Sequence, residues 1–151
     1  MRKCITIIAL LFVLKVQAQT VFTDGIVMPN IKTVQLYQQN NQMSLPVINL
    51  LSSDLLELHF DDLDGYVKNY FYTFQLCNEN WEEVNLSPFD YIKGFTQNRV
   101  SQYRVASIAL TKYVHYQAVL PERGSIPTKS GNYLLKVFLN GDVNQLNKKK
   151  K

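Results

Sequence analysis

FDDLDGYVKNYFYTFQLCNENW, residues 60–81, is the stretch that decides the fold. A strand turns successive side chains to opposite faces, so the large side chains at every second position share one face: Tyr70, Tyr72, Phe74 and Leu76. The residues before them, at 61–65, are acidic and end on a glycine, which is typical of a tight turn. Aromatic residues at period two fill a core more often than they form a binding platform. The stretch therefore predicts a core strand that follows a turn, with Trp81 packed near its end.

Further strands are expected on both sides of this one. Alternation or β-branched and aromatic content indicates strands at 31–37, 45–50, 55–61, 113–120 and 132–139. Residues 22–27 could add an edge strand, residues 88–94 are expected to be a loop, and residues 103–110 are compatible with a strand or a short helix. About seven strands without an amphipathic helix predict an antiparallel sandwich.

The segment SGNY, residues 130–133, adds a signal for the type of sandwich. It fits the tyrosine corner of immunoglobulin-like domains, in which a Tyr at the start of a late strand bonds through its hydroxyl to nearby backbone. We therefore predict an all-β, immunoglobulin/fibronectin-III-like antiparallel β-sandwich over residues 31–142.

Both ends of the chain are predicted to lie outside this domain. Residues 1–18 combine basic Arg2 and Lys3, an apolar run and a small-residue Val-Gln-Ala site, which together predict a cleavable signal peptide and export. Residues 19–30 are a mature lead segment, and residues 143–151 are expected to be a disordered basic tail.

The charge is concentrated at the two ends. Three of the 16 basic residues lie in the signal peptide and four form the run at 148–151, so the body has nine basic and 12 acidic residues. A nucleic-acid-binding domain needs a basic face on the folded body. The sequence therefore predicts no nucleic-acid partner, and no segment of the mature chain is apolar enough to cross a membrane.

Catalytic and metal-binding chemistry is sparse. His59 and His115 both fall within strands, and neither they nor Cys77 sit in a motif that activates a nucleophile. Cys77 is the single cysteine of the mature chain, so it is expected to be a small buried apolar residue without a disulfide. The turn at 61–65 lacks the spaced ligands of a calcium loop. We predict no enzyme activity, no catalytic or metal residues and no cofactor.

Two other functions stay open on residue chemistry alone. An exported carbohydrate- or ligand-binding β module would use the tyrosine-rich strand, and it requires Tyr70, Tyr72 and Trp81 to be exposed. An exported hydrolase would require His59 or His115 to lie beside a nucleophile or carboxylate cluster in a cleft.

Four segments together resemble a known family: LELHFDDLDGYVKNYFYTFQLCNENW, LSPFDYIKGF, YVHYQAVLP and SGNYLLKVF. In this order and at these distances they are similar to the amino-terminal domain of type IX secretion system plug proteins of Bacteroidota, from about residue 31 to residue 142. The resemblance implies a non-catalytic, periplasmic protein-binding domain that closes the periplasmic side of an outer-membrane β-barrel translocon. The family pattern has no catalytic residues to carry over, and the candidate protein-contact residues are Asp61, Asp62, Asp64 and Gly65.

The sequence departs from the family pattern at its end. Members of the family continue with a closing strand and a further large region, whereas here Gly141-Asp142 leads into VNQLNKKKK. We therefore expect a truncated or frameshifted fragment, whose sandwich lacks its last strand and leaves a sheet edge open.

Overall fold

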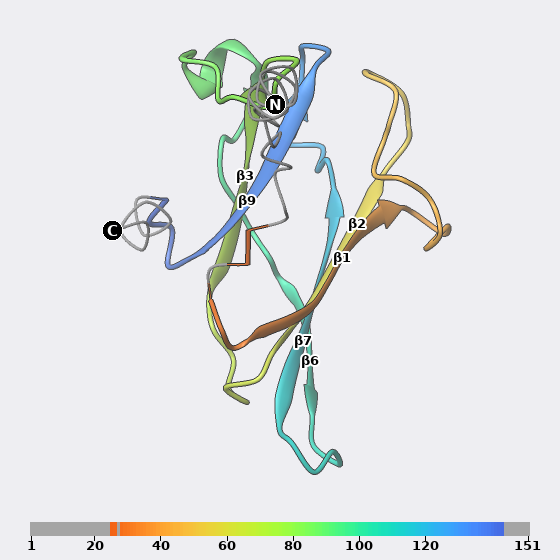
Figure 1. Cartoon of the computed structure of the whole chain (residues 1–151), viewed down its shortest axis with the longest axis vertical. Coiled ribbons are helices and arrows are strands. Elements are labelled where there is room, and N and C mark those ends of the chain that lie inside the picture. Colours follow the sequence, from red (N-terminus) through yellow and green to blue (C-terminus); the bar gives the residue numbers. More distant parts are fainter. Residues whose placement is uncertain (1–24, 27, 144–151) are drawn as a thin grey trace, which may run out of the picture.

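A computed structural model describes residues 25, 26 and 28–143, and these are almost entirely β-structure (Figure 1). The predicted signal peptide, most of the lead segment and nearly all of the basic tail lie outside the described residues. The strands are Ile31–Gln38 (β1), Leu56–Asp62 (β2), Tyr70–Cys77 (β3), Ile92–Gly94 (β4), Asn98–Arg99 (β5), Gln102–Ala106 (β6), Tyr113–Leu120 (β7), Ser125–Pro127 (β8) and Asn132–Leu139 (β9), and Pro88–Asp90 forms a short 3₁₀ turn.

The strands form the two sheets of an immunoglobulin-like sandwich. One sheet has the order β1-β2-β7-β6, the other has the order β5-β3-β9, and all pairs are antiparallel. These orders correspond to strands A-B-E-D and C′-C-F of the immunoglobulin fold. A small third sheet pairs β4 with β8. The predicted fold class is confirmed.

The core forms where β2 and β7 face β3. Strict alternation in β2 and β7 buries every second side chain, and the predicted aromatic face of β3 supplies the opposing layer. At its centre the rings of Phe60, Tyr70 and Tyr116 contact one another with centroid distances of 5.0, 5.1 and 4.8 Å. Each such aromatic pair adds about 0.5–1.5 kcal/mol beyond simple burial.

Two predictions about single residues, the tyrosine corner at Tyr133 and the burial of Cys77, are also confirmed. The hydroxyl of Tyr133, at the start of β9, donates to the backbone carbonyl of Lys129 over 2.8 Å, which is the expected tyrosine corner. Cys77 is buried with a free thiol, and burial raises the pKa of that thiol.

Residues 45–50 form an irregular loop, so the strand predicted there is wrong. Pro46 has no backbone N–H to donate to a ladder, and the N–H of Val47 bonds locally to the carbonyl of Leu45. Leu45 and Val47 face solvent. Elsewhere the ambiguous stretch 103–110 is resolved as the end of β6 followed by a turn, and the predicted loop at 88–94 contains the 3₁₀ turn and β4.

Trp81 does not pack into the core, as the sequence had predicted, and is 43% exposed. It sits in a tight turn with φ +62°, where the side-chain oxygen of Asn78 accepts hydrogen bonds from the N–H groups of Asn80 and Glu82. This local bonding turns the chain before Trp81 can reach the sandwich.

Candidate functional site

The acidic turn after β2 is anchored by a buried carboxylate. Asp62 continues the inward alternation of β2 and has no exposed surface. Its Oδ1 accepts hydrogen bonds from Asn30 Nδ2 at 2.7 Å and from the N–H of Asp64 at 3.0 Å, and its Oδ2 accepts from the Tyr70 hydroxyl at 2.9 Å. Lys68 Nζ lies 2.8 Å from the same Oδ2. Four donors therefore satisfy this carboxylate inside the protein.

These donors keep Asp62 charged. Burial alone would raise the pKa of its carboxyl, but the hydrogen bonds from Lys68, the Asp64 backbone, Asn30 and Tyr70 more than offset that effect, so the pKa lies below its ordinary value. Burial also acts on the ammonium of Lys68, and there the two neighbouring carboxylates prevail and raise the pKa.

Acid is therefore expected to destabilise the domain through Asp62. Its contribution is complete above the unfolded-state pKa of about 3.9 and is lost as the pH falls through the lower folded-state pKa. We expect the free energy of unfolding to fall below about pH 4, with a smaller acid-dependent loss in Asp62→Asn. Urea unfolding between pH 2 and 7 measures this, with Glu79→Gln, at an exposed carboxylate, as the control. An equal effect of the two substitutions would contradict this role of Asp62.

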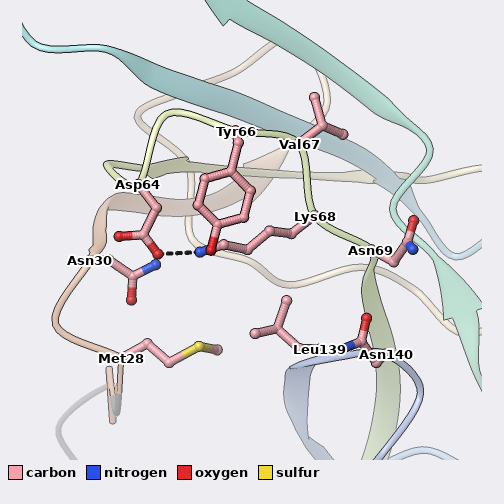
Figure 2. Close-up of a pocket in the computed structure, with 9 residues that line it drawn as sticks. All are labelled: Met28, Asn30, Asp64, Tyr66, Val67, Lys68, Asn69, Leu139 and Asn140. Atoms are coloured by element: carbon pink, nitrogen blue, oxygen red, sulfur yellow. Dashed lines mark hydrogen bonds and ion pairs between the residues drawn. The ribbon is translucent and has the colours of Figure 1, made fainter.

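The outer part of the turn packs against the β6–β7 hairpin. Gly65 has φ +74°, and a Cβ placed on it would lie 3.0 Å from the Cβ of Lys112. Asp64 faces solvent and pairs with Lys68, whose Nζ also lies 4.8 Å from the centre of the Tyr66 ring. Figure 2 shows Asp64, Lys68 and Tyr66 at one side of an open hollow that also receives Leu139 and Asn140.

The buried Tyr116 of β7 also anchors the connection between β2 and β3, through the backbone of Lys68. Its hydroxyl accepts a hydrogen bond from the N–H of Lys68 at 2.6 Å and donates to the carbonyl of Lys68 at 3.1 Å. Together with Asp62, this clamp fixes the turn to the core at both of its ends.

The structure separates the four predicted contact residues. Asp62 is buried, and Asp61 points to the opposite face of β2, where its Oδ1 lies 2.7 Å from His115 Nδ1. Gly65 is half-buried, and Asp64 is the one residue of the four that is exposed to solvent. A protein contact at this turn can therefore use Asp64 and Gly65 directly, and Asp62 only through the shape it maintains.

Sequence reasoning missed the hairpin tip at residues 107–112. This segment connects β6 to β7, and the side chains of Ile108 and Leu110 in it are fully exposed to solvent. In Figure 1 the hairpin extends beyond the rest of the molecule at the end where the β2–β3 turn also lies. The alternating apolar residues of 103–110 were the available signal, but alternation does not tell whether such side chains face a core or solvent.

A second unforeseen cluster lies on the outer face of the β1-β2-β7-β6 sheet. His59 Nδ1 and His115 Nε2 are 3.1 Å apart, and Glu57 Oε2 lies 3.4 Å from His59 Nε2. The Tyr37 ring stacks on His59 at 5.3 Å. Each histidine thus has a carboxylate on its outer side, and the contact between the facing nitrogens needs one to donate and the other to accept.

This cluster does not match the hydrolase hypothesis. The two histidines contact each other, Tyr37 and the carboxylates of Glu57 and Asp61, but none of these partners is a serine, threonine or cysteine nucleophile. The hypothesis placed a carboxylate cluster in a cleft, and that condition is not met. The two histidines lie on a sheet face, away from the residues that line the two described hollows. Among the described residues, no group of three or more His, Cys, Asp or Glu side chains is arranged to hold a metal ion.

The carbohydrate-binding hypothesis is wrong in the form that the sequence suggested. It requires an exposed row of aromatic rings, but Tyr70 and Tyr72 are completely buried. The Tyr72 hydroxyl donates to Glu122 Oε1 at 3.0 Å, so its polar end is also satisfied internally.

Across the part of the chain that the structure describes, no helix has the length and apolar character to span a membrane.

Comparison with known proteins identifies a family and solved structures to which the chain is similar. The family described as "Type 9 secretion system plug protein 1st domain" matches residues 31–151. A crystal structure of a hypothetical protein from Parabacteroides merdae is similar with a TM-score of 0.70 and 29% sequence identity. The match covers 74% of this chain and 28% of that chain, so this chain spans about a quarter of the crystallised protein. No match was found among curated protein sequences.

Proposed function

Because the chain belongs to the type 9 secretion system plug protein family, as its first domain, we propose that it is a non-catalytic module that binds the outer-membrane β-barrel translocon on its periplasmic side. The family description names a plug and not an enzyme. The signal-peptide features of residues 1–18 support export to the periplasm.

The observation that carries the proposal is the exposed apolar tip of the β6–β7 hairpin. A group of exposed apolar side chains gathered on one part of the surface is typical of a protein-interaction site. Ile108 and Leu110 are fully exposed at the tip of the hairpin, and Tyr66 and Val67 of the neighbouring turn are also exposed. We call these four residues and Asp64 the docking end.

The docking end combines the features of a protein-binding surface. Its apolar side chains can act as anchors, and Asp64 adds a charge beside them. The Asp62 network and the Tyr116 clamp hold the turn in one conformation before binding. A surface that is ordered in advance loses less conformational entropy on association.

Replacing Ile108 and Leu110 together with serine is expected to reduce recovery of the barrel at least tenfold when tagged full-length chain is purified from outer membranes. Both side chains are fully exposed, so the double substitution removes apolar contact area without opening the core. The amount of barrel relative to tagged chain, by quantitative immunoblot, is the measurement.

The matched control replaces Phe89 and Phe95, two exposed apolar residues in the β3–β5 connection, with serine. That connection lies at the opposite end of the molecule in Figure 1. Full recovery with the Ile108/Leu110 variant and loss with the Phe89/Phe95 variant would move the contact to the other end. Failure of the unsubstituted chain to recover the barrel from an intact translocon would contradict the proposed function itself.

A further inference from the structure

Four polar side chains form a continuous row on the outer face of the β1-β2-β7-β6 sheet, in the order Glu57, His59, His115 and Asp61. His59 Nε2 lies 3.4 Å from the Glu57 carboxylate. At the other end His115 Nδ1 lies 2.7 Å from the Asp61 carboxylate. Between them, His59 Nδ1 and His115 Nε2 are 3.1 Å apart. The row therefore contains three close polar contacts, and each of them needs one hydrogen atom between its two heavy atoms.

Two neutral histidines do not supply enough hydrogen atoms for this row. An ionised carboxylate accepts hydrogen bonds and donates none, so the outer contacts require hydrogens on His59 Nε2 and His115 Nδ1. A neutral imidazole carries a hydrogen on only one of its nitrogens. In a neutral pair both facing nitrogens are therefore bare, with their lone pairs directed at each other over 3.1 Å. One additional proton between the facing nitrogens satisfies all three contacts.

The gap between the facing nitrogens has the size for a proton and not for a metal ion. The ring centres are 5.3 Å apart and the nitrogens 3.1 Å apart, so both nitrogens lie between the two rings. A metal ion between two such nitrogens needs about 4 Å, because each metal–nitrogen bond is about 2.0–2.1 Å long. The observed distance lies within the usual range of protein hydrogen bonds.

The charges around the row favour the additional proton. The side chains of Glu57 and Asp61 are each 17% exposed, and that of His59 is 14% exposed. A positive charge in contact with such half-buried carboxylates stabilises both of them. The other ionisable side chains on this face of the sheet are Lys32 and Tyr37 of β1, Arg104 of β6 and Tyr113 of β7. Lys32 and Arg104 are exposed to solvent, so they compensate the carboxylates less than a proton within the row.

Tyr37 is the aromatic neighbour of the pair. Its ring stacks on that of His59, with centroids 5.3 Å apart and planes within 10° of each other. A positive charge over the face of a tyrosine ring is stabilised by the ring electrons. Burial and the Glu57 carboxylate raise the pKa of the Tyr37 hydroxyl, so this side chain stays uncharged at neutral pH.

We propose that His59 and His115 bind one shared proton at neutral pH, and that this proton makes the row a pH-sensitive clasp between β2 and β7. With the proton bound, His115 of β7 is tied to both His59 and Asp61 of β2. When the proton leaves in alkali, one of the three contacts of the row loses its hydrogen atom and opens. None of these residues belongs to the docking end, so the clasp does not depend on the proposed function.

The stability of the domain is expected to fall as the pH rises above neutral. In the unfolded chain the two imidazoles are separate and are mostly neutral above about pH 6.5. The folded chain retains the shared proton there, so it binds more protons than the unfolded chain. The free energy of unfolding therefore decreases with rising pH until the folded chain has released the proton as well.

Nuclear magnetic resonance of the full chain with ¹⁵N-labelled histidine tests the shared proton at pH 7. The chain contains two histidines, so His59→Gln and His115→Gln assign the ring signals. We expect hydrogens on both nitrogens that face carboxylates, and a ¹⁵N–¹⁵N scalar coupling between the two facing nitrogens. Two bare facing nitrogens, or a bare nitrogen facing either carboxylate, would overturn the proposal. A spectrum that changes after treatment with EDTA would also overturn it, in favour of a bound metal ion.

Thermal unfolding of Glu57→Gln tests the pH dependence. A glutamine at position 57 donates from its amide to His59 Nε2, so a neutral pair then satisfies the whole row. Glu79→Gln is the matched control, because it removes an exposed carboxylate outside the row. Between pH 7 and 9 we expect Tm of the unsubstituted chain and of Glu79→Gln to fall by at least about 3 °C more than that of Glu57→Gln. Equal pH dependence of all three proteins, or the largest fall in Glu57→Gln, would contradict the clasp.

Discussion

Replacing Asp62 with alanine is expected to lower the free energy of unfolding by about 3–5 kcal/mol, the range for removing one partner of a buried ion pair. The substitution leaves four groups without their acceptor: the Tyr70 hydroxyl, the Asn30 amide, the Asp64 backbone N–H and one side of the Lys68 ammonium. Domains of this size are stable by about 5–15 kcal/mol, so a large part of the total would be lost. Urea unfolding followed by far-UV circular dichroism is the measurement.

Asp64→Ala is the matched control, because it removes a carboxylate from the same turn and the same lysine. Asp64 is exposed and its pair with Lys68 faces solvent, so we expect a loss of no more than about 1 kcal/mol. A loss from Asp64→Ala as large as that from Asp62→Ala would show that the buried network is not the anchor of the turn.

Gly94→Ala is expected to destabilise the domain by about 2–4 kcal/mol, through backbone strain and overpacking together. Gly94 ends β4 with φ +99°, and a Cβ on it would lie 2.1 Å from the carbonyl oxygen of Gly124. The obstacle is backbone, so relief requires β4 and β8 to separate. β4 follows Tyr91 and contains Ile92, and both are core residues. The loss of stability should therefore appear in thermal unfolding of the whole domain.

Gly124→Ala offers a control at the same strand pair. A Cβ there would meet the ring of Phe95 at 3.3 Å, and Phe95 is an exposed side chain that can rotate away. We expect a change within about 1 kcal/mol. If Gly124→Ala were the more destabilising of the two, close approach of the backbones at Gly94 would not be the cause.

The strands that are best predicted from the sequence are those with one face toward solvent and one face buried in the core. In β2 and β7 the alternation is strict, and in β3 the aromatic residues mark the dry face, so period and burial agree. Residues 45–50 show the limit of this reasoning, because a short apolar run with a proline has the same composition in a strand and in an exposed loop. Whether such a run becomes a strand depends on a neighbouring strand with which it can form hydrogen bonds, and the sequence does not show which strands are neighbours.

The candidate site was only partly predictable for a related reason. Composition identified the acidic turn, but it does not tell which carboxylate faces inward. The predicted strand ended at residue 61, whereas in the structure β2 continues to Asp62 and places it on the buried side with Phe60. Its partner Asn30 lies 32 residues away in the sequence, so only the fold brings the two together. The contact between His59 and His115 likewise depends on the register of β2 against β7. The docking end could not be predicted from the sequence, because it combines residues of the β2–β3 turn with residues of the β6–β7 hairpin, and only the fold brings these two segments together.

The most direct test of the proposed docking is photo-crosslinking from the hairpin tip. The full chain would carry benzoylphenylalanine in place of Ile108, or in place of Met43 as an equally exposed apolar control in the β1–β2 connection, in cells that assemble the type 9 translocon. We predict that irradiation joins position 108, and not position 43, to the outer-membrane barrel. A crosslink to the barrel from position 43 with none from position 108 would contradict the assignment of the docking end.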